Sequence, residues 1–518
     1  MNALHDPRKQ LEYDLNKERS DLAFQRQIIS DFFCLENTRL LETHISWILL
    51  VDDKAYKIKK ALKNDFLDYS QLAKRKKFCE DEIQLNARYS SGLYLGLTRI
   101  TDNQGRAEID GKGKTLDYAV CMRRFPQEDI LFARLQSQQL CLDDMDKLCY
   151  RLCDFQETQQ AQRVRLSNKG VLDSKMSNAE CYLQDQTQAI LNNFITIRET
   201  MVLTRDETER LKHIESHSKI LLQELADLLT SRFDEGRVYD GHGDLHLNNI
   251  VLLDNQVQFF DGIEFSDTLR RVDPISELAF IIMDLEVHAD KAPGYANYLL
   301  NKWLHLSGDY QGLPLLRLFK IYRAMVRAKV AALTFQQGHS EQREVFLEYL
   351  GLAERYTKIQ NVCLSITRGL SGSGKSTHSM QKAMTEDAVW LRSDVERKRL
   401  YKHPDDARYS STATEKVYAH LLSLSKQLLS WGYSVIVDAT FLLYQQRHAF
   451  YRLSKESHAN FRILVCEVKE QELLRRLGAR HAAGKDVSEA DVAVMYRQKE
   501  QQEALKSDEQ HYALELSR

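Results

Sequence analysis

The stretch GLSGSGKST, residues 369–377, has the residue types and the spacing of a phosphate-binding loop. Its glycines let backbone N–H groups turn towards phosphate oxygens, and the helix that should follow adds the positive end of its dipole. Lys375 is expected to neutralise β- and γ-phosphate oxygens, and the Ser376 hydroxyl is expected to ligate Mg²⁺. We therefore predict an ATP site formed by Gly369, Ser371, Gly372, Ser373, Gly374, Lys375, Ser376 and Thr377.

Two carboxylates further along the chain have the placement needed to act beside that loop. AVWLRSDVERKRL, residues 388–400, predicts a strand that ends near Asp394, whose carboxylate can take a proton from an attacking hydroxyl. Arg397, one helical turn on, would hold an anionic group of the acceptor; in the alternative interpretation, Asp394 only caps a helix with solvated arginines. SVIVDAT, residues 434–440, predicts a buried parallel strand ending at Asp438, a carboxylate able to hold the water shell of Mg²⁺.

The segment LLRRLGAR, residues 473–480, carries Arg475, Arg476 and Arg480. Arginines there can close over ATP and stabilise the charge that moves onto a transferred phosphoryl group. A solvated helix face is the alternative for each of them, and we select Arg480 as the catalytic candidate. Asp438 is followed by Ala439 and Thr440 rather than by a glutamate that would activate water, which favours transfer to a hydroxyl over ATP hydrolysis.

The elements around these residues predict an α/β unit. VCLSIT (362–367), SVIVDAT and FRILVCEV (461–468) are predicted to be buried parallel strands. Residues 412–432 predict a helix with a capping box from Thr412 to Glu415 and an apolar face formed by Val417, Leu421, Leu424 and Leu428. A chain of 518 residues is too long for one hydrophobic core, and the charged segment AERYTKIQN marks a boundary. We predict domains over residues 1–357 and 358–518.

Together, GLSGSGKST, RSDVERKRL, VIVDATF and RRLGAR with GKDVSEAD resemble P-loop kinases of the gluconate kinase, zeta-toxin and polynucleotide kinase group. The resemblance covers about residues 362–518. It implies phosphorylation of a hydroxyl on a small molecule, a nucleotide sugar or a nucleic-acid end. It also implies that Asp394 is the aspartate that activates the acceptor and that Arg397 binds the acceptor.

The stretch YDGHGDLHLNNIVLLDNQVQFFDGIEF, residues 239–265, matches the order of the catalytic loop and the metal-binding aspartate of protein-kinase-like enzymes. In that order Asp244 takes the acceptor proton, while Asn249 and Asp261 ligate Mg²⁺. HGDLHLNN with FFDGIEF resembles the aminoglycoside-phosphotransferase-like branch of this fold, over roughly residues 30–350. His242 and His246 form a disfavoured zinc alternative, because no third ligand stands out.

The same resemblance implies nucleotide-binding residues upstream. It places Lys57 of AYKIKK at the ATP-binding lysine, with Lys59 as the fallback, and it pairs that lysine with Glu82, or alternatively Glu80. Residues 119–127 resemble the strand that runs into an adenine-binding hinge, and the helix with Asp273 and Glu277 resembles the one that braces the catalytic loop.

Two departures distinguish the front half from that branch. No G-x-G-x-x-G precedes Lys57, and Phe155-Gln156 stand where we expect Phe-His in relatives. We favour an active domain over a nucleotide-binding regulator.

The fold class that we predict is an α+β protein-kinase-like N-terminal domain with two lobes, followed by an α/β P-loop NTPase domain with a parallel sheet. The whole resembles bacterial tandem proteins that join an aminoglycoside-phosphotransferase-like domain to a P-loop kinase. We predict an ATP- and Mg²⁺-dependent kinase that phosphorylates a hydroxyl of a small metabolite. The alternatives are a 5′-hydroxyl polynucleotide kinase, and a P-loop kinase whose front domain binds nucleotide and regulates it.

Composition limits the partners and the compartment. The net charge is −2, so the chain has no overall basic field for nucleic acid, which is a permitted but not a favoured partner. Nine cysteines are scattered without a Cys-x-x-Cys pair, and the polar start shows no apolar signal core. We expect a cytoplasmic protein with no membrane partner.

Overall fold

The computed structural model describes residues 21–32, 38–43, 45–64, 67–168, 178–358, 361–402, 410–483 and 492–516. The chain divides into two compact units. Unit 1 comprises Met1–Cys141, Arg151–Asn193 and Leu222–Asp284, and unit 2 comprises Leu142–Tyr150, Phe194–Leu221 and Leu285–Arg518. Residues 285–357 therefore cluster with the C-terminal sheet, and the domain boundary at residue 358 stays a prediction.

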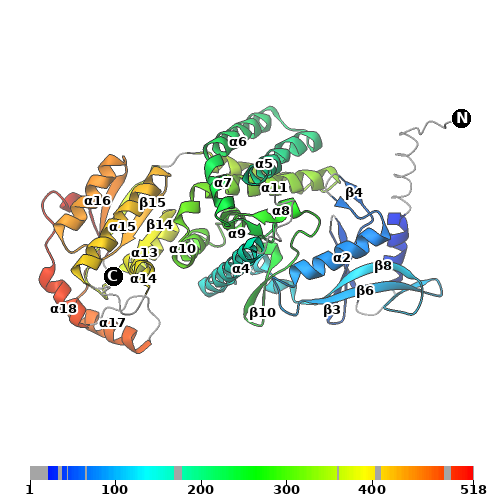
Figure 1. Cartoon of the computed structure of the whole chain (residues 1–518), viewed down its shortest axis with the longest axis horizontal. Helices are drawn as coiled ribbons and strands as arrows, with labels where there is room; N and C mark the ends of the chain where they lie inside the picture. Colours follow the sequence, from blue (N-terminus) through cyan, green and yellow to red (C-terminus); the bar gives the residue numbers. More distant parts are fainter. Residues whose placement is uncertain are drawn as a thin grey trace. The chain divides into compact units, whose positions relative to one another are not determined.

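Unit 1 begins with a six-stranded antiparallel sheet in the order β1-β2-β3-β8-β6-β7. Helix α2 (Leu72–Asn86) packs beside strands β6 and β8 (Figure 1). Apolar side chains of these strands fill two clusters, one that contains Trp47 and one that contains Val120. The bounds are β1 Arg39–Glu42, β2 Ser46–Val51, β3 Lys54–Lys59, β6 Tyr94–Asn103, β7 Arg106–Ile109 and β8 Thr115–Arg123.

The second part of unit 1 is mostly helical and carries a short hairpin, β10 (Ile250–Leu253) and β11 (Gln256–Phe259). Asp254 and Asn255 form its two-residue turn with positive φ values of 50° and 63°, the geometry that this turn type requires. This arrangement of a sheet lobe and a helical lobe confirms the predicted protein-kinase-like fold. The other elements up to residue 287 are β4 Lys63–Asn64, β5 Leu67–Asp68, η1 Gln127–Asp129, α3 Leu131–Gln136, α4 Leu142–Asn168, α5 Ala179–Thr200, α6 Arg205–Glu224, α7 Ala226–Asp234, β9 Tyr239–Asp240, η2 Leu247–Asn249, α8 Asp267–Arg270, β12 Arg271–Val272 and α9 Pro274–Val287. Most of α6 and the ends of α4, α5 and α9 cluster with unit 2.

Unit 2 contains a five-stranded parallel sheet in the order β14-β15-β13-β16-β17, which confirms the predicted α/β P-loop fold. Strands β13, β15 and β16 are buried along most of their length, as expected for a parallel sheet. The predicted strands are observed within two or three residues of their expected ends. The bounds are β13 Cys363–Arg368, β14 Ala388–Arg392, β15 Ser434–Asp438, β16 Asn460–Val465 and β17 Ala513–Glu515.

The helices of unit 2 include α15, whose predicted apolar face is buried at Val417, Leu421, Leu424 and Leu428. Its start differs from the prediction, because Ser410, not Thr412, caps the helix and accepts a hydrogen bond from the Ala413 N–H. The bounds are α10 Tyr295–Ser307, η3 Tyr310–Gly312, α11 Pro314–Gln336, α12 Gln342–Tyr356, α13 Lys375–Thr385, α14 Ser393–Leu400, α15 Ser411–Ser430, α16 Tyr444–Glu456, α17 Glu470–Ala483, α18 Val492–Gln501 and η4 Gln510–Tyr512.

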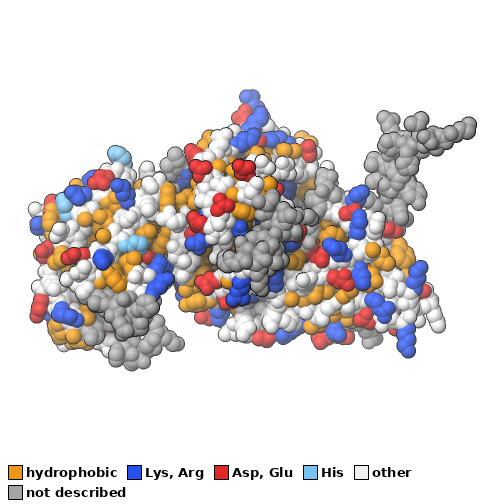
Figure 2. Space-filling view, in the orientation of Figure 1, with side chains coloured by type: hydrophobic (Ala, Val, Ile, Leu, Met, Phe, Trp, Pro, Cys, Tyr) orange, Lys and Arg blue, Asp and Glu red, His pale blue; other side chains and the backbone are white. Residues whose placement is uncertain are grey.

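The surface carries both signs of charge. On the face drawn in Figure 2, Lys and Arg side chains are interspersed with Asp and Glu side chains. Among the helices that the structure describes, none combines the length and the apolar character needed to cross a membrane.

Candidate active sites

The phosphate-binding loop of unit 2 connects β13 to α13, at the carboxyl edge of the parallel sheet. Gly374 is the N-cap of α13 and has a φ of +93°, so the helix begins at Lys375 with its positive end at the loop. Gly369 has a φ of +157°, and a Cβ there would lie 2.4 Å from the carbonyl oxygen of Cys466. The tight turn at the start of the loop therefore requires glycine.

The polar groups of this loop fit the phosphates of ATP. Lys375 Nζ lies 2.8 Å from the carbonyl oxygen of Leu370, so its side chain folds back over the loop. The Ser373 hydroxyl is buried and, among the residues that the structure describes, has no hydrogen-bond partner. Buried polar groups are usually paired, and a phosphate oxygen would satisfy this one.

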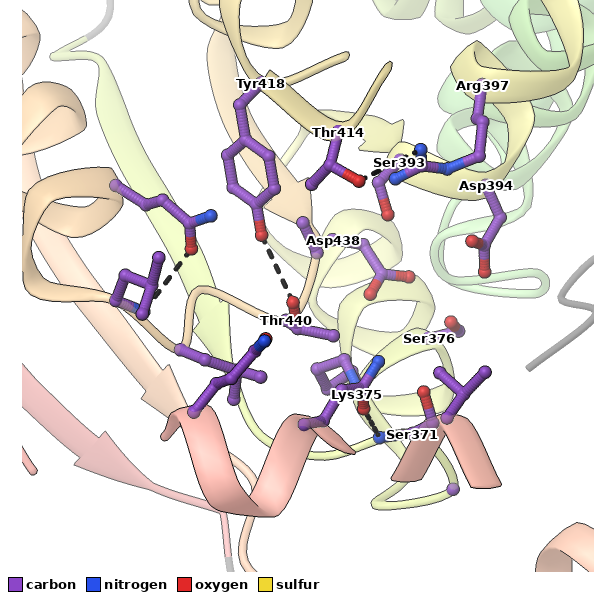
Figure 3. Close-up of a pocket in the computed structure, with 18 of the residues that line it drawn as sticks. Ser371, Lys375, Ser376, Ser393, Asp394, Arg397, Thr414, Tyr418, Asp438 and Thr440 are labelled. Carbon is purple, nitrogen blue, oxygen red and sulfur yellow. Dashed lines mark hydrogen bonds between the residues drawn. The ribbon is translucent and has the colours of Figure 1, made fainter. Parts of the chain in front are cut away.

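The loop opens onto a cavity of about 910 Å³. Lys375 and Ser376 line one wall, Asp438 lies at the end of β15, and Asp394 and Arg397 line the wall formed by α14. In Figure 3 the carboxylates of Asp394 and Asp438 and the hydroxyl of Ser376 point into the same space. The structure thus brings together five of the residues that the sequence singled out, namely Lys375, Ser376, Asp394, Arg397 and Asp438.

Asp438 is a buried carboxylate with polar neighbours. Burial raises its pKa above the ordinary value, although the positive charges of Arg392 and Lys375 and a hydrogen bond from Ser376 oppose that rise. Trp390 Nε1 also donates to Asp438 Oδ2 at 3.3 Å. Mg²⁺ prefers one or two protein oxygens and keeps several waters, so Asp438 and Ser376 fit such an ion.

Asp394 and Arg397 lie three residues apart in α14 and share a face of that helix. Arg397 is only 8% exposed, and its Nη1 lies 3.5 Å from Thr414 Oγ1. The cavity wall, and not a solvated helix face, is therefore where the structure places Arg397. Its role toward an acceptor stays a prediction.

Two of the three arginines in this segment have described side chains. Arg476 lines the cavity and its Nε donates to Glu472 Oε1 at 2.7 Å. Arg475 pairs with the same glutamate but is exposed to solvent. Arg480, the residue preferred from the sequence, lies in α17 with its side chain outside the described residues. Arg476 is thus an additional candidate for contacting phosphate.

Several lining residues carried no recognisable sequence signal. The Tyr418 hydroxyl lies 3.2 Å from Thr440 Oγ1 and accepts from the N–H of Phe441 at 3.1 Å. Gln498 of α18 accepts a hydrogen bond from the Ser371 N–H at 2.9 Å. Tyr418 directly follows Val417 of the predicted apolar face of α15. This position beside a buried face is the signal in the sequence that could have indicated an inward-facing side chain.

In unit 1 the predicted lysine–glutamate pair forms on β3 and α2. Lys57 Nζ lies 2.9 Å from Glu82 Oε1 and also contacts Asp261. Burial would lower the pKa of Lys57, but the charges of Asp261 and Glu82 raise it well above its ordinary value. Glu80, the alternative partner, faces solvent beside Lys76.

The fallback lysine is also engaged, because Lys59 shares the face of β3 with Lys57. Lys59 Nζ lies 2.6 Å from Glu82 Oε2 and contacts Glu264, which in turn accepts from the Tyr69 hydroxyl. Both lysines are buried, so each needs the carboxylates that surround it. The strand thus presents two paired lysines where one was predicted.

His242 links the loop that carries Asp244 to the strand end before Asp261. Its Nε2 donates to the carbonyl oxygen of Phe260 at 2.9 Å, and its Nδ1 accepts from the Asp244 N–H at 3.3 Å. Burial lowers the pKa of His242 to about 4, so the ring is neutral and suited to these two roles. Both ring nitrogens are thereby occupied, which argues against the zinc alternative.

Asn249 lies beside Asp244, as predicted. Its Nδ2 donates to the Asp244 carbonyl oxygen at 2.9 Å and lies 3.3 Å from Asp244 Oδ2. The Asn249 carbonyl oxygen accepts from the N–H of Phe260, which precedes Asp261. The three predicted residues are therefore linked by hydrogen bonds and by the chain itself, and their chemical roles stay predictions.

Helix α9 braces this loop, as the resemblance implied. Glu277 Oε1 accepts from the His242 N–H at 2.7 Å, and Asp284 Oδ2 accepts from the Leu247 N–H at 2.9 Å. Asp273 pairs with Arg232 at 2.6 Å instead. Gln156 donates to the carbonyl oxygen of Pro274 at 3.1 Å, so it contacts the start of the same helix.

Comparisons with known proteins agree with this description. Residues 364–505 match a family model described as an AAA domain. An uncharacterised protein of Mycobacterium tuberculosis and one of Mycobacterium bovis are each 29% identical over 462 residues, which cover 87% of this chain and 88% of each relative. No function is given in the names of these relatives.

Solved structures resemble each half separately. The APS kinase of Mycobacterium tuberculosis, in complex with AMPPNP and APS, is 22% identical over 30% of this chain and 90% of its own, with a TM-score of 0.24. The GDP complex of aminoglycoside 2′-phosphotransferase-IIIa is 13% identical over 65% and 98%, with a TM-score of 0.37. Choline kinase from Cryptosporidium parvum is 9% identical over 62% and 89%, with a TM-score of 0.38. Scores below 0.5 say nothing about the substrate of this chain.

The fold and the site geometry define a class. The first unit has a protein-kinase-like fold with a lysine–glutamate pair. The P-loop domain follows it in the chain, and its loop opens onto a cavity that is lined by Asp394 and Asp438. The prediction that this chain is an enzyme of the kinase class is confirmed at this level, and nucleotide binding by each unit stays a prediction.

Proposed function

We propose that the chain is an ATP- and Mg²⁺-dependent phosphotransferase whose P-loop site phosphorylates a hydroxyl of a small metabolite. The observation that carries the proposal is the shared cavity, which has the phosphate-binding loop on one wall and Asp394 with Arg397 on the other. A site for hydrolysis alone would need no such second wall. The cavity of about 910 Å³ has room for a nucleotide and a small acceptor together.

The proposed reaction uses four residues. Lys375 holds the β- and γ-phosphate oxygens, and Ser376 with Asp438 holds Mg²⁺ and its waters. ATP supplies the γ-phosphoryl group when it is bound, and the ion screens the charge on that group. Asp394 accepts the proton of the acceptor hydroxyl as the new oxygen–phosphorus bond forms and the bond to the ADP oxygen breaks.

The acceptor end of the cavity supports a polar, anionic acceptor. Arg397 is a nearly buried cation, and hydroxyl groups of Ser393, Ser411, Thr414 and Tyr418 line the same region. A guanidinium in such a place fits a carboxylate or a phosphate, and hydroxyls fit a polyhydroxylated body. This composition favours a small metabolite.

Unit 1 supports a second phosphotransferase site. Lys57 with Glu82, and Asp244 with Asn249, have the pairing that a protein-kinase-like reaction needs. The turn before Lys57 is the two-residue connection Asp52-Asp53 and offers no glycine-rich cover for phosphates. A nucleotide-binding regulator is therefore the second candidate for this unit.

The nucleic-acid alternative has less support. Both signs of charge are interspersed on the face in Figure 2, and the net charge of −2 gives no field to attract a polyanion. A 5′-hydroxyl oligonucleotide nevertheless belongs among the acceptors that are tested.

The test is ATP-dependent phosphorylation by the purified full chain of pooled hydroxylated metabolites and of a 5′-hydroxyl oligonucleotide. Wild type, Asp244→Asn, Asp394→Asn and the double variant are compared side by side. Asparagine keeps the size of the side chain but cannot accept the proton, so we expect Asp394→Asn to lose its product by about 100-fold or more.

The outcomes separate the candidates. If each single variant loses a different product, the chain has two active sites and the products name the acceptors. If Asp394→Asn loses all products and Asp244→Asn loses none, unit 1 is a regulator. If Asp394→Asn forms every product at the wild-type rate, the proposed role of Asp394 is wrong. If the phosphorylated product is the oligonucleotide, the acceptor is a nucleic-acid end and not a small metabolite.

A further inference from the structure

Helix α10 lies against the edge of the parallel sheet although it precedes the P-loop by some 60 residues of chain. Asn301 is buried and makes a two-pronged contact with the edge strand β14. Its Nδ2 donates to the Ala388 carbonyl oxygen at 2.9 Å, and its Oδ1 accepts from the Trp390 N–H at 2.6 Å. The side-chain amide thus satisfies edge groups that a further strand would otherwise pair.

His305 extends this contact by one helical turn. Its Nε2 donates to the Trp390 carbonyl oxygen at 2.8 Å, and its ring packs edge-on against the Trp390 indole. The Trp390 indole N–H in turn reaches Asp438. A chain of hydrogen bonds therefore links α10 through Trp390 to the Asp438 carboxylate at the end of β15.

A second set of contacts links α10 and η3 to α14. Glu396 is fully buried on this helix and accepts from three side chains. The Tyr310 hydroxyl of η3 donates to Glu396 Oε1 at 3.0 Å, His420 Nε2 lies 3.2 Å from Oε2, and Arg399 forms an ion pair with it. Arg399 Nη2 also donates to the carbonyl oxygens of Leu304 and His305, at 3.2 and 3.0 Å, where α10 ends.

The close approach at this point leaves no room for a larger residue. Gly308 is the C-cap of α10 with a φ of +70°, and a Cβ there would lie 2.7 Å from Arg399 Nε. Glu396 and Arg399 are three residues apart on one side of α14, while Asp394 and Arg397 are three residues apart on the side that lines the cavity. The position of α14 against α10 therefore sets where Asp394 and Arg397 point.

We propose that Tyr310 and Glu396 are positioning residues for the acceptor site, and that α10 and η3 are a working part of the P-loop kinase rather than of the kinase-like half. This inference rests on the proposed function for its catalytic consequence. The geometric statement, that α14 is held from its buried side by these two residues, stands apart from it.

The test uses Tyr310→Phe in the full chain, which removes one hydroxyl and keeps the ring. Its matched control is Tyr298→Phe on α10, because the Tyr298 hydroxyl donates to Asp146 Oδ1 at 2.7 Å and does not contact α14. We expect kcat/KM for the acceptor to fall about tenfold in Tyr310→Phe, since small misplacements of reacting groups have large effects on rate. Affinity for a fluorescent ATP analogue should stay within about twofold of wild type, because the P-loop makes none of these contacts.

A second readout needs no acceptor. Amide hydrogen exchange should quicken over residues 393–400 in Tyr310→Phe, and stay at the wild-type rate over residues 369–385 and throughout the Tyr298→Phe variant. In a Glu396→Leu background, Tyr310→Phe should add little further effect, because leucine has no oxygen to accept the Tyr310 hydroxyl and both changes therefore remove the same hydrogen bond.

Equal exchange over residues 393–400 in the two tyrosine variants would overturn the proposal, as would fully additive effects of Tyr310→Phe and Glu396→Leu. If the wild-type chain phosphorylates no acceptor, the proposed function fails, and the exchange rates still decide whether Tyr310 holds α14.

Discussion

Lys57 Nζ lies 2.9 Å from one oxygen of Glu82, and Lys59 Nζ lies 2.6 Å from the other oxygen. One buried carboxylate therefore serves two buried lysines. Breaking a buried ion pair is strongly destabilising, by about 3–5 kcal/mol, when it leaves a charge unpaired. Lys57→Met leaves Glu82 paired with Lys59, so we expect this variant to fold and to lose nucleotide binding in unit 1.

Binding of a fluorescent ATP analogue measures this loss, in a Lys375→Ala background that removes the P-loop site. Lys60→Met is the matched control, because Lys60 pairs with Glu42 at 2.7 Å, away from Glu82. If Lys57→Met binds nucleotide as well as the control does, Lys57 is not the ATP-binding lysine, and Lys59→Met is the next variant to test.

Lys375→Ala should abolish phosphoryl transfer by the P-loop site and leave nucleotide binding in unit 1 unchanged. Lys375 supplies the positive charge at the loop, and removing a charge that stabilises a transferring phosphoryl group lowers the rate by about 1000-fold. Product formation with each acceptor and the number of nucleotides bound per chain measure the two effects. Lys382→Ala, on the same helix and paired with Glu386 at 2.8 Å, is the control.

A loss of nucleotide at both sites in Lys375→Ala would contradict the view that the two folds bind ATP independently.

Much of the P-loop site could be predicted from the sequence because its groups are close in the chain or end consecutive strands. The loop and Asp394 follow buried strands, Asp438 ends one, and parallel strands bring their carboxyl ends to one edge. Asp244 and Asn249 are likewise five residues apart, so one loop determines both. In these cases local spacing was enough.

The rest depended on contacts between distant segments. Nothing in the spacing of Tyr310 and Glu396 relates two residues 86 positions apart. Arg476 and Arg480 are four residues apart in α17, so the helical period does not separate them, and only Arg476 has a described side chain in the cavity. The Thr412–Glu415 pattern predicts a cap at Thr412, but Ser410 caps α15 two residues earlier.

Glycine substitutions separate a required turn from an ordinary helix position. In Gly369→Ala the new Cβ would meet the Cys466 carbonyl oxygen at 2.4 Å, so the loop must shift and nucleotide affinity should fall by about tenfold or more. Gly478→Ala places its Cβ in open space within α17, and we expect it to raise the free energy of unfolding by about 1 kcal/mol.

Isothermal titration with an ATP analogue and denaturant unfolding measure these two effects. Equal nucleotide affinity in Gly369→Ala and wild type would show that the loop does not need the glycine at its first position.

Acid should destabilise both units through buried neutral histidines. Burial lowers the pKa of His242 and of His305 to about 4 each, from 6.5. Between these values the unfolded chain binds a proton that the folded chain does not, so the free energy of unfolding is unaffected well above pH 6.5 and falls as the pH drops towards 4. The same relation gives a loss of about 2 kcal/mol per histidine at pH 5 relative to pH 8.

His305→Gln isolates one of these contributions, because a glutamine amide can still donate to the Trp390 carbonyl oxygen but does not titrate. Urea unfolding at pH 8 and pH 5, followed by the fluorescence of tryptophans such as Trp390, should show a smaller acid loss in His305→Gln than in wild type. The exposed His458→Gln should show the full wild-type loss, since this side chain lies in solvent in the folded chain and makes no buried contact that acid could break. If the free energy of unfolding falls by the same amount between pH 8 and pH 5 in His305→Gln and in wild type, the neutral ring of His305 does not contribute to the acid sensitivity. The imidazole would then be protonated in the folded chain.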